Sequence, residues 1–485
     1  MGWGLSLRVA LLAFLAFLLL LQPQPHGDGI SYIWYLQEGN LLGHHLLYLP
    51  VMKGFCTLAE FFGISTRSAA FLFSALCGGA AVLLMHRLLA SSRALCPGAR
   101  HPWLWTLIFA ACPAVLFYST TVENHAHHLF WCCAFLLCLD RVLASEAEHG
   151  RRLWLWPSAT ILLLAVYTSH SSSLLLWPGL LLCLHLRQGR LLRLPQWSEI
   201  SRYLLLFGPV LLFKLAEPLL KARVFGGGEE QLSDAHTLFA LDLLGWRDLS
   251  TWLEYLGHEV LLPIGAALVA GGFALRGRWL GMAVSILLPY LLFFGHWNIY
   301  EYGAYYLAPL PLLLLLSAAS SRPQGLGAKS RAVVLVVTLG LMGYGLGNTL
   351  SYTSRHPEAV WNWAKDLRQL ADSESTVIVY YGVRGITLLA DTDIHDVQML
   401  ESWWMLMAPA VAAKGPDVFK SHIYRIMPEL FASWTAKGKG PLIVSKEARA
   451  AMQRDWPPLL AWLEQHASWE PISKGIFSGF VLKAR

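Results

Sequence analysis

Two carboxylates follow apolar runs in this sequence, at positions where acid–base chemistry could use them. Asp28 comes soon after the first apolar run, 5–22, and Glu123 follows the run 103–119. A carboxylate at the rim of an apolar environment is costly, so it is a functional candidate. Poor solvation also raises its affinity for protons, which makes it a capable general base for an acceptor hydroxyl. Because Asp28 stands between two glycines, it could equally cap a turn or a helix.

Histidines accompany both carboxylates. His26, His44 and His45 share the segment of Asp28, and His170 stands in a short turn between two apolar runs. Three more follow Glu123 at helical spacings that could ligate a metal: His125, His127 and His128. The sequence lacks a His-Glu-x-x-His pattern, so a zinc hydrolase is the weaker interpretation.

Lys221 and Arg223 stand where a seventh apolar run ends. They could neutralise a lipid phosphate, although basic side chains at helix ends commonly extend to lipid head groups. The glycine-rich pieces 226–228 and 438–440 lack the strand-to-helix setting of a phosphate-binding loop and are interpreted as turns.

The composition is that of a polytopic membrane protein. Hydrophobic residues make up 55% of the 485 positions and charged residues 14%, whereas about 25% of a soluble domain is charged. The net charge of +6 does not indicate a nucleic-acid partner, because the basic residues occupy short loops between apolar runs. All eight cysteines lie between Cys56 and Cys183, mostly inside apolar runs, so no disulfide framework is expected in the C-terminal part.

Apolar runs predict about eleven transmembrane helices, at roughly 20 residues per span. They lie near 5–22, 68–90, 103–119, 126–144, 154–168, 171–186, 202–218, 258–275, 280–296, 304–320 and 331–350. No small-x-small cleavage site precedes His26, so the first run is interpreted as a retained helix. Lysine and arginine crowd one set of loops, which places that set and the N-terminus in the cytoplasm. Asp28, Glu123, His170 and Glu301 then face the opposite compartment.

The segment Tyr48–Phe62 carries apolar residues at helical spacing, interrupted by Lys53 and Glu60. This pattern fits an amphipathic helix that lies on the membrane, and it fits an ordinary packed loop equally well.

From Ser351 onward the pattern becomes that of a soluble α/β domain. Strand-like segments alternate with helical ones, which favours a small three-layer unit. Helices are expected over 356–372 and 446–466, the second interrupted by two prolines, and strands over 376–382, 394–400, 441–445 and 476–482.

The polar loops together resemble those of the GT-C glycosyltransferases, and most closely the protein O-mannosyltransferase-like branch. Asp28 followed by Gly43-His-His-Leu-Leu-Tyr-Leu-Pro50 is similar to the first exoplasmic loop of that family, and Ser119-Thr-Thr-Val-Glu-Asn-His-Ala126 to its second acidic loop. His170 corresponds to a histidine of the next loop, and the segment with Glu301 and Tyr302 resembles the late loop before a proline-containing helix. His45-Leu-Leu replaces the expected Pro-Pro-Gly, and no acidic doublet follows the first helix, so the donor, the acceptor and any metal dependence are left open.

The resemblance implies a GT-C-like membrane module over 1–350 and an exoplasmic α/β domain over 351–485. The membrane module would transfer a sugar, with inversion, from a polyprenyl-phosphate donor to an acceptor hydroxyl of a glycan, lipid or protein. Asp28 would be the general base, and Glu123 would orient the acceptor or bind a cation. Substrate contacts would come from His26, His44, His45, His170, Glu301, Tyr302, Lys221 and Arg223. No cofactor is implied with certainty, and a divalent cation is left open.

Two other functions fit the same residues. One is a transporter or flippase of a lipid-linked glycan, with Asp28 and Glu123 as substrate ligands, although no internal repeat supports it. The other is a non-catalytic subunit of envelope assembly. The absence of Asn-x-Ser/Thr acceptors favours a bacterial inner membrane with the C-terminal domain in the periplasm.

Overall fold

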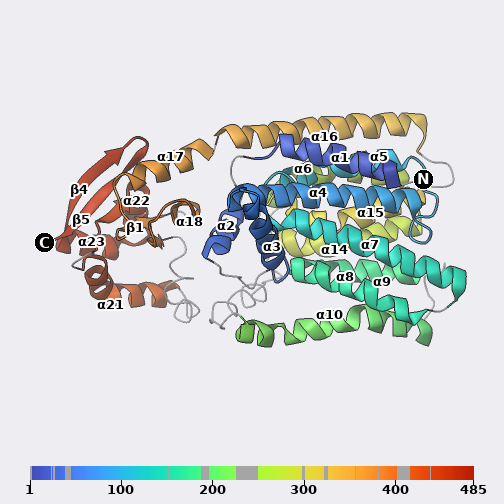
Figure 1. The fold of residues 1–485 in the computed structure, drawn as a ribbon, viewed down its shortest axis with the longest axis horizontal. Coiled ribbons are helices and arrows are strands. Elements are labelled where there is room, and N and C mark those ends of the chain that lie inside the picture. Colours follow the sequence, from blue (N-terminus) through green and yellow to red (C-terminus); the bar gives the residue numbers. More distant parts are fainter. Residues whose placement is uncertain are drawn as a thin grey trace. The chain divides into compact units, whose positions relative to one another are not determined.

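The protein consists of two compact units (Figure 1). The computed structural model describes residues 3–22, 25, 28–38, 45–150, 152–186, 196–224, 249–297, 301–321, 326–355, 357–380, 382–400, 416–436 and 439–485. The first unit comprises most of the chain up to Ser351, and the second comprises Tyr352–Arg485 together with Ile30–Asn40. The short helix α2 (Gly29–Glu38) therefore begins in the first unit and continues in the second.

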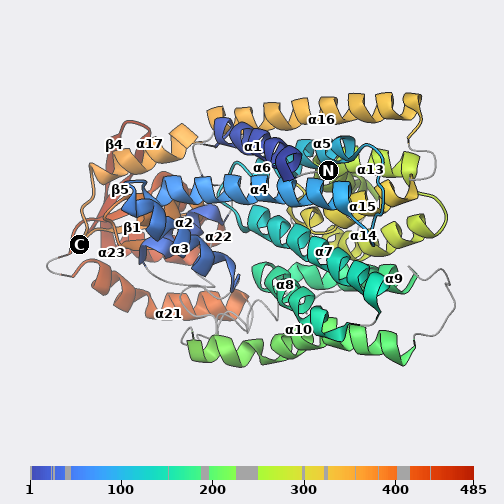
Figure 2. The ribbon, with the colours of Figure 1, turned by 45° about the vertical axis from the view of Figure 1, so that its right-hand side comes forward.

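The first unit is a bundle whose long helices run in roughly the same direction (Figures 1 and 2). Its α-helices are α1 (Trp3–Leu19), α3 (Tyr48–Phe61), α4 (Thr66–Ser91), α5 (Pro102–Ala111), α6 (Pro113–Tyr118), α7 (Asn124–His149), α8 (Trp156–Ser169), α9 (Trp177–Leu186), α10 (Trp197–Val224), α12 (Leu249–Tyr255), α13 (Leu262–Ala274), α14 (Arg278–Trp297), α15 (Leu310–Ser320) and α16 (Ala328–Arg355). Short 3₁₀ turns, η1 (Leu153–Leu155), η2 (Ser171–Leu176) and η4 (Ala304–Leu307), connect some of them.

Each predicted apolar run coincides with helix in the structure. In the described part of the chain, five helical stretches are long and apolar enough to cross a membrane: Thr66–Ser91, Asn124–His149, Leu249–Ala274, Arg278–Gly295 and Ala328–Leu350. Others are apolar but shorter, among them α1, α5 and α15. The total of about eleven spans therefore stays a prediction.

The run expected as one helix over 103–119 is divided into α5 and α6. Cys112 joins them with an extended backbone, φ −57° and ψ 126°. The cause is Pro113, because a proline disfavours helical backbone at the residue before it and lacks the N–H that would continue the ladder. The break lies inside the bundle, where Cys112 and Phe109 are fully buried.

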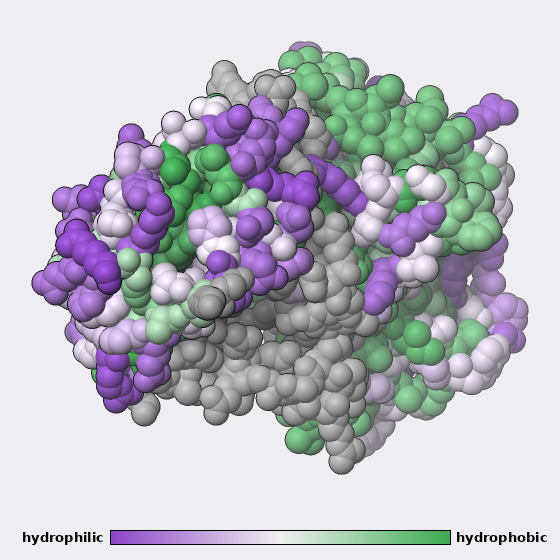
Figure 3. Space-filling view, turned by 60° about the vertical axis from the view of Figure 1, so that its left-hand side comes forward, coloured by the Kyte–Doolittle hydropathy of each residue, from purple (hydrophilic) through white to green (hydrophobic). Residues whose placement is uncertain are grey.

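The outer surface of the bundle is apolar. On α10, Leu212 and Leu215 are each 68% exposed, and α1, α14 and α16 also expose leucines or valines. Figure 3 shows a continuous hydrophobic area over the helical unit, whereas hydrophilic residues dominate the visible surface of the second unit. Apolar surface of this extent is expected where lipid tails replace water as the solvent.

Helix α3 is apolar on two faces. Tyr48, Met52 and Cys56 are buried against the bundle, while Phe61 and Phe62, at and just beyond its end, are 84% and 71% exposed. Burial on one side and exposed aromatic rings on the other fit the helix predicted at Tyr48–Phe62 better than an irregular loop does.

The second unit is an α/β unit around a five-stranded mixed sheet of order β2-β1-β3-β5-β4. The strands are β1 (Thr376–Val379), β2 (Asp396–Met399), β3 (Leu442–Ser445), β4 (Ala467–Lys474) and β5 (Phe477–Ala484). β1 pairs in parallel with β2 and β3, and the β4–β5 hairpin joins β3 antiparallel. One core joins the sheet to α21 (Pro416–Trp434), α22 (Lys446–Asp455) and α23 (Pro457–His466), and a second joins it to α17 (Pro357–Arg368) and α18 (Gly382–Asp391).

The sequence pattern missed three of these elements, namely β4, α18 and α21. β4 contains Glu470 and Pro471 and is mostly exposed, so it lacks the apolar run of a buried strand. It forms because β5 pairs with it over eight residues, from Ala467–Ala484 to Lys474–Phe477. As the edge strand of the sheet it can hold a proline without breaking an interior ladder.

The α/β unit is expected to fold when residues 352–485 are expressed alone. It contains two hydrophobic cores of its own, and all its strands pair within this segment. Circular dichroism and thermal unfolding of the isolated segment test this. A segment without a cooperative transition would show that the folding unit requires more of the chain, Ile30–Asn40 being the first candidate.

Candidate active site

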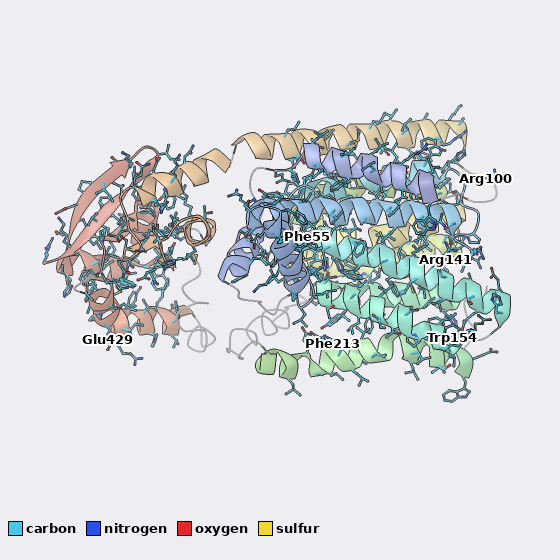
Figure 4. The ribbon with its side chains drawn as sticks, viewed as in Figure 1. Phe55, Arg100, Arg141, Trp154, Phe213 and Glu429 are labelled. Atoms are coloured by element: carbon cyan, nitrogen blue, oxygen red, sulfur yellow. The ribbon has the colours of Figure 1, made fainter. Side chains whose placement is uncertain are left out.

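Three carboxylates from distant parts of the sequence converge at one end of the helical unit. Asp28 stands in the turn before α2, Glu123 directly before α7, and Glu301 in the loop before η4. Figure 4 shows Phe55 of α3 at this end of the bundle and Arg100, Arg141 and Trp154 at the opposite end. The arginine-rich loops and the carboxylates are thus separated by the length of the helices.

A glycine allows the Asp28 turn to lie against the Glu123 turn. The backbone N–H of Gly29 donates to Oε1 of Glu123 at 3.3 Å. A Cβ atom at position 29 would lie 1.8 Å from the carbonyl oxygen of Val122, which no real side chain can do. Gly29 is therefore required for the close approach of the two turns, rather than only as a helix start.

Glu123 is buried, and burial raises the pKa of its carboxyl well above the ordinary value. The negative charges of Asp28 and Glu301 raise this pKa further, while backbone hydrogen bonds from Gly29 and Asn124 oppose the increase. Asp28 by contrast is exposed. Two neighbouring carboxyl groups in such different surroundings can divide roles, the solvated one as a base and the buried one as a protonated hydrogen-bond donor.

Glu301 is paired with a histidine. Its Oε2 lies 3.6 Å from Nε2 of His125, in the first turn of α7. Burial opposes ionisation of Glu301, but the hydrogen bond and the charge of His125, with a hydrogen bond from Tyr305, lower its pKa below the ordinary value. The pair thus places an ionised carboxylate next to an imidazole at the start of α7.

A buried carboxylate in α12–α13 holds the Glu301 loop. Glu259 accepts hydrogen bonds from the backbone N–H groups of Glu301, Tyr302 and Gly303 at 3.1, 3.0 and 2.9 Å. The hydroxyl of Tyr118 donates to the carbonyl oxygen of Glu301. Tyr302 and Gly303 both have left-handed backbone, with φ 48° and 75°. For a tyrosine this conformation is strained, and the three bonds to Glu259 compensate for the strain.

Glu259 belongs to the π-helical turn η3 (Leu256–Leu261), which interrupts the helix between α12 and α13. The N–H of Leu262 donates to the carbonyl oxygen of Gly257, five residues earlier. Pro263 follows, and its ring would clash with the carbonyl group four residues back, which is that of Glu259. Wider turns of this kind often occur at functional sites, and here the turn contains the carboxylate that holds the loop.

Replacing Glu259 by glutamine should destabilise the helical unit by about 1–3 kcal/mol, because the amide nitrogen of glutamine cannot accept a hydrogen bond and leaves at least one buried backbone N–H group without its acceptor. Thermal unfolding of the purified protein in detergent measures the effect. Glu254→Gln is the matched control, since Glu254 is exposed on the same helical stretch. Equal unfolding temperatures for the two variants would contradict the role assigned to Glu259.

Histidines line the same end of the bundle around His170. The ring of His170 lies 5.1 Å from that of His45, 5.3 Å from His125 and 5.5 Å from His128, between centroids. Its Nδ1 accepts from the backbone N–H of Ser172 at 3.2 Å, so the ring proton is on Nε2. Burial lowers the pKa of His170 to about 3, which favours the neutral ring with its proton on Nε2.

The other two histidines of α7 pack into their surroundings. His128 Nδ1 contacts Ser169 Oγ at 2.8 Å, and Trp131 Nε1 donates to His127 Nε2 at 2.8 Å. His127 also packs against Tyr48 and Phe73. The helical spacing that suggested a metal site on α7 therefore directs these rings into different environments. Within the described ranges, no group of three or more His, Cys, Asp or Glu side chains is arranged to hold a metal ion.

The structure brings together Asp28, Glu123, His45, His170 and Glu301 among the predicted site residues. The Tyr302 ring instead packs on Phe117, with centroids 5.2 Å apart. Two predicted residues, His26 and His44, lie outside the described residues. Helix α10 includes Lys221 and Arg223, whose side chains also lie outside the described part.

Three residues at this site were not predicted, namely His125, Glu259 and Tyr305. The sequence pattern places His125 on the same side as Asp28 but suggests only metal ligation for it, and it gives Glu259 no role. A signal was present for Glu259, since an acidic residue inside an apolar run needs a partner. The partner itself could not be identified, because it is the backbone of a loop more than forty residues away.

Comparisons with known proteins identify the fold. No protein-family model and no curated protein sequence matches the chain. The crystal structure of ArnT from Cupriavidus metallidurans bound to undecaprenyl phosphate matches with a TM-score of 0.57 at 12% identity, over 99% of this chain and 98% of that chain. The apo structure of the same protein matches with a TM-score of 0.61 at 14% identity, over 99% and 97%. ArnT is a GT-C glycosyltransferase.

The chain has the GT-C fold. This confirms the fold indicated by the loop motifs, whereas membership of the superfamily and of its protein O-mannosyltransferase-like branch stays a prediction. The GT-C fold and the apolar helices together make the protein an integral membrane protein.

Proposed function

We propose that this protein is a membrane glycosyltransferase that moves a sugar from a polyprenyl-phosphate donor to an acceptor hydroxyl. The observation that carries the proposal is the convergence of Asp28, Glu123 and Glu301 at one end of a GT-C fold. The ArnT structure bound to undecaprenyl phosphate supports a polyprenyl-phosphate lipid as the partner.

Asp28 acts as the general base. It is the exposed member of the carboxylate group, so it can remain ionised and accept the proton of the acceptor hydroxyl. The resulting alkoxide attacks the anomeric carbon, the bond from that carbon to the phosphate oxygen breaks with inversion, and the electron pair leaves with the lipid phosphate.

Glu123 orients the acceptor. Because burial and the neighbouring carboxylates raise its pKa, the carboxyl group holds a proton that it can donate in a hydrogen bond to a sugar or acceptor oxygen. Asp28 and Glu123 are tied together through Gly29, so both can contact the same acceptor group. If a divalent cation takes part, these two carboxyl groups are the candidates to hold it.

The test is a transfer assay with purified protein, an acceptor panel and a panel of polyprenyl-phosphate sugars. Formation of a glycosylated product supports the proposal. A transporter or flippase would bind the lipid-linked sugar and move it across vesicles without forming product, and a non-catalytic subunit would do neither. Either result would contradict a glycosyltransferase.

The Asp28 loop and the C-terminal α/β unit should lie on the same, non-cytoplasmic side of the membrane. Lysine and arginine crowd the loops at the opposite end of the helices, which the positive-inside rule places in the cytoplasm. Cysteines introduced at Ser31 and Ser473, in a background with the native cysteines replaced, should react with an impermeant maleimide in intact cells. Protection of either one would contradict this topology, and with it the proposed periplasmic location.

A further inference from the structure

We infer that Gln22 is a positioning residue, which holds the chain segment that leads to Asp28 against the turn that leads to Glu123. This inference rests on the proposed function and assigns to Gln22 the spacing of two carboxyl groups of the same site. Gln22 follows the last residue of α1, Leu19, and precedes Asp28 in the sequence. A positioning residue acts through the groups that it holds rather than by contact with the substrate.

Three hydrogen bonds connect Gln22 to the turn that follows α6. Its backbone N–H donates to the carbonyl oxygen of Thr120 at 2.9 Å. Its side-chain Nε2 donates to the carbonyl oxygen of Phe117 at 3.3 Å and to Oγ1 of Thr120 at 3.2 Å. All three residues are buried. Because the turn is attached at three points, it cannot pivot about the backbone hydrogen bond.

A second connection lies further along the same two chain segments. The backbone N–H of Gly29 donates to Oε1 of Glu123 at 3.3 Å, so the segments are joined at Gln22 and again at Gly29. Pro25 stands between the two connections, is buried, and has its Cβ atom 3.0 Å from the position of a Cβ atom at Gly29. Because the φ of proline is fixed, this short stretch transmits a shift at Gln22 toward the Asp28 turn.

The turn after α6 is also held by α4. A Cβ atom at Gly78 of α4 would lie 2.2 Å from Oγ of Ser119 and 3.1 Å from the ring of Phe17. Gly78 therefore allows both α1 and the turn to approach α4 closely. Since α4 fixes this contact, the hydrogen bonds of Gln22 determine how the turn lies relative to the segment of Asp28.

Stability alone does not account for a glutamine at position 22. Its Oε1 is buried and, among the described residues, has no hydrogen-bond partner, which costs free energy. The carbonyl oxygen of Phe117 does not depend on Gln22, because the backbone N–H and the hydroxyl of Thr120 also donate to it, at 3.1 and 2.9 Å. An apolar side chain of the same length would avoid the unpaired oxygen. A residue that breaks a local rule in this way is typical of a functional position.

Gln22→Met tests the inference, because methionine has the length of glutamine but cannot donate its side-chain hydrogen bonds. The variant should unfold at the temperature of the wild type or above, since the unpaired Oε1 is removed as well. The amide hydrogen of Gly29 should nevertheless exchange roughly tenfold faster, because two of the hydrogen bonds that hold the turn are lost. Hydrogen exchange of the purified protein in detergent, resolved to single amides by mass spectrometry, measures this without a substrate.

In the transfer assay, Gln22→Met should lower kcat by roughly tenfold or more, because a displacement of about 1 Å between reacting groups slows the chemical step. The Kd of the polyprenyl-phosphate sugar should stay close to that of the wild type. A residue that only stabilised the fold would instead change the unfolding temperature and leave kcat of the folded protein unchanged.

Variants of Thr120 test the same contact from its other partner. Thr120→Val removes the hydroxyl that accepts from Gln22, so Gly29 should again exchange faster, whereas Thr120→Ser keeps the hydroxyl and should retain the wild-type rate. The matched control is Thr160→Val in α8, where a buried hydroxyl also donates to backbone carbonyl groups. This control should leave the exchange of Gly29 unchanged. Adding Thr120→Val to Gln22→Met should have little further effect, because both remove one contact.

Unchanged exchange of Gly29 in Gln22→Met and in Thr120→Val would show that Gln22 does not hold the two turns, and the inference would be wrong while the glycosyltransferase proposal stands. Faster exchange with an unchanged kcat would also overturn it, because transfer would then not depend on this contact. If Gln22→Met does not fold, Thr120→Val decides alone. A wild type that forms no product contradicts the glycosyltransferase proposal instead, and the exchange rates still decide whether Gln22 holds the turns.

Discussion

Replacing Asp28 by asparagine should reduce sugar transfer by roughly 10²–10⁴-fold, the usual contribution of a general base. Asparagine keeps the shape of the side chain and its capacity to hydrogen-bond, so the Asp28–Gly29 turn should remain in place. The amide cannot accept the proton of the acceptor hydroxyl, and that step alone is lost. The loss should appear in kcat, while binding of the lipid donor stays close to that of the wild type.

His128→Asn is the matched control for Asp28→Asn. The asparagine amide can replace Nδ1 of His128 as the donor to Ser169, and His128 faces the helix packing rather than the acceptor. Its transfer rate should stay within a few-fold of the wild type. Near-normal turnover of Asp28→Asn in the same assay would show that another group removes the proton, and Glu123→Gln would then be the next variant to measure.

Replacing Gly29 by alanine should be nearly as damaging, although it adds only one methyl group. The new Cβ would lie 1.8 Å from the carbonyl oxygen of Val122, and that oxygen is backbone and cannot rotate away. The turn that carries Asp28 must therefore move away from the turn that carries Glu123. Displacement of a reacting group by about 1 Å can reduce the rate by roughly 10²-fold.

Gly54→Ala shows whether this loss comes from the contact or from alanine itself. Gly54 lies in α3, with no atom within 4 Å of the position of its added Cβ, so alanine there should be neutral or slightly stabilising. Both proteins should insert and purify like the wild type, with a large loss of transfer for Gly29→Ala only. Equal activity of the two variants would mean that the two turns do not need to be in contact during the reaction.

The sequence alone predicted the apolar helices well, because membrane spans are local features. A segment that crosses the lipid must itself be a long run of apolar residues, so it can be found without knowing the rest of the fold. The positions of α4, α7 and α16 follow from such runs. Local rules also account for β1 and β3, because each has three consecutive aliphatic residues and one hydroxyl residue, all buried. They fail for β4, whose stability comes from pairing with β5 rather than from its own composition.

The candidate site was predicted in part. Asp28, Glu123, His170 and Glu301 stood out because polar residues next to apolar runs are conspicuous, and all of them lie at one end of the bundle. The residues that hold these side chains and their loops in place could not be identified in the sequence. Glu259 lies inside an apolar run, and it accepts hydrogen bonds from three backbone N–H groups. Because every residue except proline has such a group, the pattern of side chains does not show which ones it binds.

What the sequence by itself determined is the set of groups available to the site and the elements that carry them. The tertiary structure decided which of these groups meet. Asp28, Glu123 and Glu301 are separated by between 95 and 273 residues, so only the packing of the helical unit brings them together. The tertiary structure also determines the pKa and the partner of each group. Burial and neighbouring charges, which depend on chain segments far away in the sequence, raise the pKa of Glu123 and lower that of His170, and the same packing pairs Glu301 with His125.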